Sequence, residues 1–251
     1  MIVYPRKNIF ILLSTTLFFY GCSTTLTAPK VNYSSYKINT TPFIDSSYTL
    51  MLKPYRDSLN KTMNEVIGFS TNGLTKKQPE SGLGNFMVDA IKIMAEKKLK
   101  SKIDAAFVNF GGIRTYIPRG DVTVGKIFEL MPFDNIIVVQ TLSGNQLISF
   151  LNIACEKGGW PVSYGLTYSI KDKKLSEVLI NNKPIDLNAS YIIANSDYIA
   201  NGGDNCEVLK AIPKQSLNYL IRDALLDYTK LLTAEGKPIN ANIENRVTYA
   251  K

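Results

Sequence analysis

Three separate segments of the chain gather side chains that can hold a ligand. They are Val108-Asn-Phe-Gly-Gly-Ile-Arg114, Met131-Pro-Phe-Asp-Asn135 and Ser196-Asp-Tyr-Ile-Ala-Asn-Gly-Gly-Asp204. The guanidinium of Arg114 can donate two aligned hydrogen bonds to a phosphate or a carboxylate. The faces of Phe133 and Tyr198 can stack on a flat base, and the carboxylate of Asp204 can accept hydrogen bonds from hydroxyl groups. Taken singly, each residue also has a plain structural interpretation, such as a turn, a core aromatic or a surface cation.

The composition excludes several classes of chemistry within this chain. It contains no His, so every His-dependent catalytic triad and every His-containing metal site is ruled out here. The Asp and Glu residues show no clustered spacing that predicts a metal site. Lys and Arg number 29 against 21 Asp and Glu, but they are scattered, and we predict no nucleic-acid partner.

The first 22 residues predict an exported protein. Arg6 and Lys7 precede an apolar run from Ile9 to Tyr20, which is followed by Gly21-Cys22. This pattern is typical of a signal peptide and resembles the lipobox of bacterial lipoproteins, in which Cys22 would carry the lipid. Plain secretion and an uncleaved anchor are the alternatives. We expect a flexible tether over residues 23–47, and a lipid-anchored, periplasm-facing place in a bacterial cell envelope.

Hydrophobic periodicity predicts one domain over residues 48–251 in which helices and strands alternate irregularly. The expected helices are Tyr48 to about Asn64, Leu83–Lys98, a helix capped by Ser143 that runs through Cys155, and Leu217–Leu232. The expected strands are Glu65–Ser70, Asp104–Asn109, Ile136–Leu142, Leu166–Ile170, Glu177–Ile180 and Tyr191–Ala194, with a turn at Asn201-Gly-Gly-Asp204. This mixture predicts an α/β or α+β fold.

The motifs together resemble the C-terminal domain of the 5'-nucleotidase and UDP-sugar hydrolase family. They occur in the family's order: Glu80-Ser-Gly-Leu-Gly-Asn-Phe-Met-Val-Asp-Ala90, Asn109-Phe-Gly-Gly-Ile-Arg114, Pro132-Phe133 and Asn201-Gly-Gly-Asp204. The resemblance covers most of residues 50–248 and implies a layered domain with a mixed sheet and flanking helices. In that family this domain supplies the substrate pocket, and a separate metallophosphoesterase domain supplies the metal ions and the catalytic His-Asp pair.

The resemblance also implies roles for individual residues. Arg114 would face a phosphate, Tyr198 would stack on the base and Asp204 would bind the ribose hydroxyls. The substrate-binding positions carried over are Asn109, Gly112, Arg114, Phe133, Tyr198, Asn201, Gly203 and Asp204. For Asn85 and Asp89, in the helix motif, we expect structural packing.

Three departures from the family pattern affect the expected ligand. Phe110 stands where a small residue is usual, and Asn205-Cys206 replaces the usual Gly-aromatic pair. Lys76 and Lys77 occupy the stretch where the family often carries an Arg of the phosphate clamp. Lys carries its charge on a single ammonium group and lacks the paired donors of the Arg guanidinium. The sequence therefore predicts weakened phosphate binding.

The catalytic half of the family is not expected in this chain. Only 79 residues precede the motif that begins at Glu80, and the His ligands are absent, so we expect no catalytic residue, no metal site and no cofactor here. We therefore expect the nucleotide- or nucleoside-binding half of a split hydrolase for nucleotide catabolism, with divalent metal ions in a partner metallophosphoesterase. A stand-alone nucleoside-binding lipoprotein and a structural protein with a vestigial pocket are the alternatives. Cys155 and Cys206 would either pair or remain free thiols.

Overall fold

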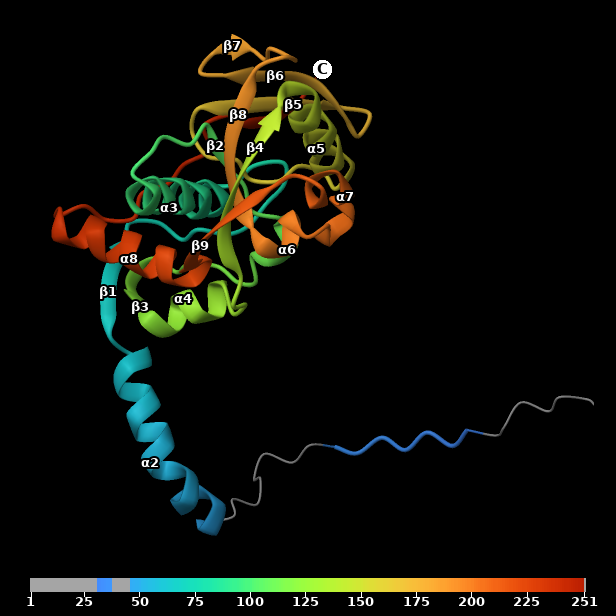
Figure 1. Ribbon diagram of the computed structural model, residues 1–251. Helices are drawn as coiled ribbons and strands as arrows, with labels where there is room; N and C mark the ends of the chain where they lie inside the picture. Colours follow the sequence, from blue (N-terminus) through green and yellow to red (C-terminus); the bar gives the residue numbers. More distant parts are fainter. Residues whose placement is uncertain (1–30, 38–45, 251) are drawn as a thin grey trace, which may run out of the picture. The chain divides into compact units, whose positions relative to one another are not determined.

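A computed structural model describes residues 31–37 and 46–250 (Figure 1). The expected signal peptide with Cys22, and residues 23–30 and 38–45 of the expected tether, lie outside the described residues. Residues 31–37 are exposed and belong to no helix or strand. Residues Ser47–Lys251 form one compact unit. In the described part of the chain, no helix combines the length and the apolar character that crossing a membrane requires.

A central four-stranded sheet separates two hydrophobic cores. Its strand order is β2 (Ala105–Ala106), β8 (Ser190–Ser196), β4 (Ile136–Ser143) and β9 (Lys214–Leu220). β8 is parallel to β2 and antiparallel to β4, which is in turn antiparallel to β9. Because successive side chains of a strand point to opposite faces, Ala106 packs into one core and its neighbour Ala105 into the other.

The first core lies against α3 (Gly82–Leu99) and α8 (Ile221–Ala234), which also pack on each other. A two-stranded antiparallel sheet of β1 (Val66–Ser70) and β3 (Gly120–Thr123), together with α4 (Val124–Leu130), covers the same core. α2 (Ser46–Met63) precedes β1 and has no buried residue.

The second core lies between the central sheet, α5 (Gly144–Glu156) and a second four-stranded sheet. That sheet has the order β10 (Val247–Tyr249), β5 (Leu166–Lys171), β6 (Lys174–Ile180) and β7 (Lys183–Pro184). Phe150 anchors the core by edge-to-face contacts with Phe107 at 5.0 Å and Trp160 at 5.9 Å between ring centroids. Each such aromatic pair stabilises the fold by about 0.5–1.5 kcal/mol in addition to the effect of burying its apolar surface.

A buried polar network fastens the C-terminal segment to α3. Glu80 accepts hydrogen bonds from Asn85 at 2.7 Å and from the backbone N–H groups of Glu244 at 2.9 Å and Arg246 at 3.0 Å. The guanidinium of Arg246 donates to both oxygens of Asp89, at 2.6 and 2.8 Å. Asn85 and Asp89 therefore have the packing role expected of them, because the Asn85 amide nitrogen and both carboxylate oxygens of Asp89 are bonded within the protein. Asn85 Oδ1 is buried without a partner among the described residues.

The α/β fold class with a mixed sheet is confirmed, and the capping box at Ser143 is present. The helix expected over Leu217–Leu232 was wrong at its start: residues Lys214–Leu220 form β9, and α8 begins at Ile221. Pairing of β9 with β4 overrides the local helical periodicity. The strand expected over Asp104–Asn109 pairs as a ladder only at Ala105–Ala106.

Several short elements were missed because their periodicity is too brief to read. They are β3, α4, β7, β10, α6 (Asp197–Ala200), α7 (Glu207–Lys210) and the 3₁₀ turns η1 (Phe110–Gly112) and η2 (Gly203–Asn205). At two of these places, η1 and η2, the sequence indicated only a Gly-Gly turn.

Candidate ligand-binding site

The three polar segments meet at one edge of the central sheet. β8 ends at Ser196, opposite Ile137 near the start of the antiparallel strand β4. β2 runs parallel to β8, so the turn η1 that follows β2 reaches the same edge, where α6 leaves the sheet (Figure 1). Strand direction alone thus brings residues 108–114, 131–135 and 196–204 together.

A cavity of about 380 Å³ opens between these segments. Its lining residues are Val108, Asn109, Gly111, Gly112, Met131, Phe133, Asn135, Ser196, Tyr198, Asp204 and Ile221. Its walls are mainly apolar with a few polar groups, which is the usual make-up of a small-molecule site.

Two aromatic side chains in the cavity wall are partly exposed. Phe133 exposes 41% of its surface and Tyr198 exposes 47%. Burial of a large aromatic ring is energetically favourable. Two half-exposed rings in one cavity therefore offer faces that a flat ligand can cover.

Asp204 is the only acidic residue in that lining, and neutral donors hold it in place. Its carboxylate accepts hydrogen bonds from Asn109 Nδ2 at 2.7 Å and from the hydroxyl of Tyr198 at 3.1 Å. The hydrogen bond to Asp204 raises the pKa of Tyr198, because the phenol must give up that bond to ionise. A carboxylate has about four acceptor positions, so Asp204 keeps capacity for a ligand hydroxyl.

Two glycines permit this arrangement. A Cβ on Gly112 would lie 2.8 Å from Asn109 Oδ1, and a Cβ on Gly203 would lie 2.6 Å from ring atoms of Tyr198. Both distances are shorter than a real carbon contact. The glycines therefore act by allowing Asn109 and Tyr198 to approach the backbone.

Asp197 and Arg222 fix the loops that carry the two rings. Asp197 Oδ1 accepts from the backbone N–H groups of Ile136 at 3.0 Å and Tyr198 at 2.9 Å, which ties the two ring-bearing segments to one carboxylate. Arg222 donates to Asp134 at 2.7 Å and lies 4.3 Å over the ring of Phe128. The spacing of Phe133 and Tyr198 is therefore set by contacts outside the cavity.

Arg114 lies at the rim of the cavity and is absent from its lining. Its Nη1 donates to the carbonyl of Gly111, a lining residue, at 3.3 Å, and its guanidinium carbon lies 5.7 Å from the centroid of the Phe133 ring. The side chain is exposed, so N–H groups of its guanidinium remain available to an anion near the ring.

Lys76 is engaged by the turn that precedes Arg114. Its Nζ donates to the carbonyl of Ile113 at 2.9 Å and lies 4.5 Å over the ring of Phe110. The unusual Phe110 thus provides a cation–π contact for one of the two Lys residues in the expected clamp stretch. Gln78, in the same stretch, makes its hydrogen bonds away from this turn: its amide donates to the carbonyls of Lys157 and Gly159.

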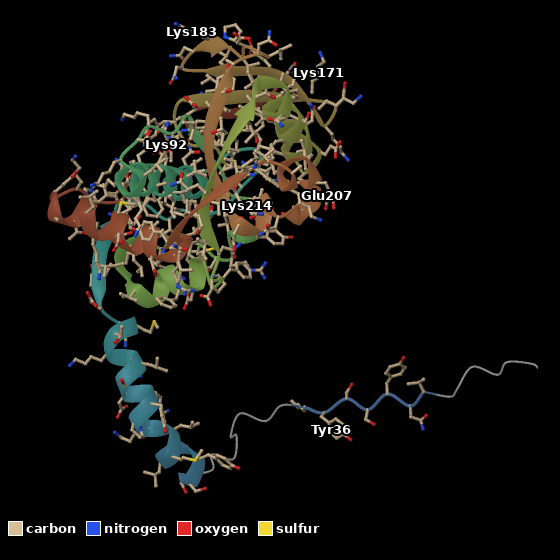
Figure 2. All side chains as sticks on the ribbon, in the orientation of Figure 1. Tyr36, Lys92, Lys171, Lys183, Glu207 and Lys214 are labelled. Atoms are coloured by element: carbon tan, nitrogen blue, oxygen red, sulfur yellow. The ribbon has the colours of Figure 1, made fainter. Side chains whose placement is uncertain are left out.

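The structure brings five of the eight predicted residues into the cavity wall: Asn109, Gly112, Phe133, Tyr198 and Asp204. Asn201 and Gly203 line a neighbouring groove that shares Asn135 and Tyr198 with the cavity. There Asn201 accepts a hydrogen bond from Lys214 of β9, labelled in Figure 2.

Sequence reasoning did not select Asn135, Ser196 or Ile221, although all three line the cavity. Asn135 and Ser196 stood at the ends of quoted segments, and their polar side chains were the available signal. Ile221 carried no signal, because local periodicity makes the junction of β9 and α8 look like continuous helix.

Cys155 and Cys206 are buried free thiols, which decides between the two alternatives left by the sequence. Burial raises the pKa of each to about 12. Within residues 31–37 and 46–250, no three His, Cys, Asp or Glu side chains are grouped so that they could hold a metal ion.

A two-core α/β domain with an aromatic, carboxylate-bearing cavity at the edge of its sheet defines a small-molecule-binding domain. The model of the 5'-nucleotidase C-terminal domain matches residues 64–211, and the chain belongs to this family.

Comparison with individual proteins agrees with this assignment. The chain is 27% identical over 217 residues to the trifunctional nucleotide phosphoesterase protein YfkN of Bacillus subtilis, covering 78% of this chain and 14% of that protein. It is 25% identical over 247 residues to the cell wall protein Lmo0130 of Listeria monocytogenes, covering 88% and 31%. A crystal structure of a 5'-nucleotidase precursor from Thermus thermophilus superposes with a TM-score of 0.71 at 28% identity, covering 82% of this chain and 44% of that one. The chain thus spans less than half the length of each of these relatives.

Proposed function

We propose that this chain is the substrate-binding half of a split 5'-nucleotidase or UDP-sugar hydrolase. It holds a nucleotide, nucleoside or nucleotide sugar, and a separately encoded, exported metallophosphoesterase supplies divalent metal ions and hydrolysis. The observation that carries the proposal is the cavity in which Phe133 and Tyr198 are half exposed beside the carboxylate of Asp204.

Each part of such a ligand has a matching group. The base stacks on Phe133 and Tyr198, which contributes roughly 1–3 kcal/mol per stacked contact. The ribose hydroxyls donate to Asp204, whose position Asn109 fixes. The phosphate meets the exposed fork of Arg114 at the rim, beside the Phe133 ring.

Hydrolysis is assigned to a partner because of the chemistry that this chain offers. Metal-assisted phosphoester hydrolysis needs ligands that hold a metal ion and a group that activates water, and the sequence contains no His for either role. We therefore propose no catalytic residue and no metal site in this chain. Two relatives support the reaction class: one is named a nucleotide phosphoesterase, and the other a 5'-nucleotidase precursor.

We propose that the chain works in the cell envelope, anchored by a lipid on Cys22. Holding both halves at one membrane would raise their effective concentration, as a covalent link does between two domains of one chain. The Listeria relative, named as a cell wall protein, supports an envelope location.

One observation favours a second candidate function, capture of nucleosides without hydrolysis. Lys76, one of two cations in the expected clamp stretch, is already engaged by Ile113 and Phe110. The other, Lys77, lines a groove that shares no residue with the cavity, which leaves Arg114 to bind a phosphate. A stand-alone binding lipoprotein would then prefer adenosine to AMP.

The deciding experiment combines calorimetry with a phosphate-release assay on the purified chain. We expect AMP, adenosine or UDP-glucose to bind without phosphate release in the presence of Mn²⁺. Tyr198→Leu and Phe133→Leu should each weaken binding by about 5–150-fold, the equivalent of one lost stacking contact. Tyr116→Leu is the matched control, because Tyr116 is 52% exposed and lies outside the cavity lining.

Three outcomes would contradict the proposal. Phosphate release by the chain alone would place catalysis in this domain. Binding of none of these ligands would leave the cavity without the proposed role and favour a structural protein. Tight adenosine binding that no exported metallophosphoesterase alters would favour the capture function.

A further inference from the structure

The helix α2 presents an apolar face that the rest of the described chain leaves uncovered. Met51, Leu52, Tyr55 and Leu59 expose 59%, 52%, 69% and 58% of their surfaces, and none of the residues of α2 is buried. At 100° per residue these four side chains fall within about 100° of arc, the width of a stripe that normally faces a core. An exposed stripe of this kind marks an interaction surface.

Apart from Leu50 and Pro54, the rest of α2 outside the stripe is mainly polar, and the helix carries both signs of charge. Its charged residues are Lys53, Arg56, Asp57 and Lys61, and Lys53 pairs with Asp57 at 2.6 Å. The apolar stripe is therefore a defined side of an amphipathic helix.

We propose that this stripe of α2 is the docking surface for the metallophosphoesterase half, and lies in an apolar groove of that protein. The inference rests on the proposed function, and it adds the place of contact. α2 ends at Met63 and the matched family domain begins at residue 64, so the helix sits directly at the boundary of the substrate-binding domain. The chain spans only 44% of a related 5'-nucleotidase precursor, so in that relative the matching domain is joined to further chain.

The composition of the stripe fits a protein groove better than the other occupants. Tyr and Met are enriched in the cores of protein interfaces, and anchors spaced at i, i+3, i+4 and i+7 are the pattern by which helices dock in grooves. Leu52, Tyr55 and Leu59 follow this spacing. A coiled coil with a second copy would be indicated by a stripe sustained over three or four heptads, whereas this one covers nine residues.

A lipid surface is the other occupant to test. Helices that lie on membranes carry many Lys and Arg on the polar face. In α2 three cations stand against one Asp, and one of the cations is already paired with it. A standard protein interface buries about 800 Å² on each side, more than four side chains supply, so a stable complex would need further contact surface on this chain.

Photocrosslinking in cells that make the full chain tests the surface directly. A photoreactive phenylalanine analogue is placed at Leu59 on the stripe, and at Asn60 on the polar face as the matched position. We expect the Leu59 probe, and not the Asn60 probe, to capture an exported metallophosphoesterase. Capture of lipid or of a second copy of the chain, or no product, would overturn the inference.

The captured protein is then purified and mixed with the full chain to measure phosphate release from AMP. We expect Leu52→Ser combined with Leu59→Ser to weaken association and the rate at limiting concentration by at least about tenfold, as loss of interface anchors does. Leu50→Ser is the control, since Leu50 is 69% exposed on the opposite face of the same helix. The melting temperature and adenosine binding should be unchanged in all variants.

The two proposals fail differently. If the wild-type chain binds adenosine and supports hydrolysis, but the Leu52→Ser, Leu59→Ser variant does so equally well, only the docking role of α2 is refuted. If the wild-type chain binds no nucleoside or nucleotide, the proposed function itself is refuted.

Discussion

Asn109 donates a 2.7 Å hydrogen bond to the carboxylate of Asp204, 95 positions further along the chain. The bond joins the segment after β2 to η2, which follows β8 and α6; β2 and β8 are parallel neighbours in the central sheet. With the Tyr198 hydroxyl on the other carboxylate oxygen, it holds Asp204 in the cavity wall.

Asp204→Asn should weaken nucleoside binding by about 10–100-fold, because a hydrogen bond to a charged group contributes about 1.5–3 kcal/mol. Calorimetry with adenosine and 2',3'-dideoxyadenosine measures the effect. The wild-type chain should prefer adenosine, and the variant should bind both ligands with similar affinity. An unchanged preference in the variant would mean that Asp204 does not bind the ribose.

Arg114→Gln should weaken binding of AMP by about tenfold and leave adenosine binding unchanged, because the guanidinium at the rim meets only the phosphate. Arg114→Lys should restore part of the loss, since Lys keeps the charge without the fork. Competition between AMP and adenosine provides the readout. Equal losses for the two ligands would show that Arg114 acts through the position of Phe133.

Arg246→Met should lower the free energy of unfolding by about 3 kcal/mol, because it leaves the carboxylate of Asp89 without its bidentate partner. Urea denaturation measures the change. Lys210→Met is the control, since Lys210 and Glu207 are exposed and 3.7 Å apart, and such pairs contribute about 0–1 kcal/mol. Adding Asp89→Asn to Arg246→Met should recover stability; a further loss would contradict the assigned role.

Cys155 and Cys206 should resist a thiol reagent such as Ellman's reagent in the native protein. Burial raises the pKa of both thiols to about 12, so at neutral pH the reactive thiolate is scarce in the folded state. Because a raised pKa favours the neutral thiol, folding stability from these groups should fall as the pH rises above the ordinary thiol pKa toward 12. In a Cys22→Ser chain, two thiols should react after unfolding and none before it; rapid native labelling would refute their burial.

Much of the architecture follows from local pattern. The periodicity of residues 83–98 and 143–155 predicts α3 and α5 to within two residues, since an amphipathic stripe and a capping residue are local properties of the chain. The three motif segments also indicate a binding site by their residue types alone. Arg, aromatic and carboxylate side chains can together bind the phosphate, the base and the hydroxyl groups of one ligand.

Other features were decided only by tertiary structure. Residues 217–220 have helical periodicity, but pairing with β4 makes them strand, and this places Ile221 in the cavity wall. Arg114 stands two residues after the Gly-Gly pair, and the turn directs it to the rim, whereas Asn135 enters the lining. The sequence by itself determined which chemical groups the chain carries and which segments fold locally; the distances between groups far apart in the chain, such as Asn109 and Asp204, depend on strand order and direction, which are set by the packing of the whole domain.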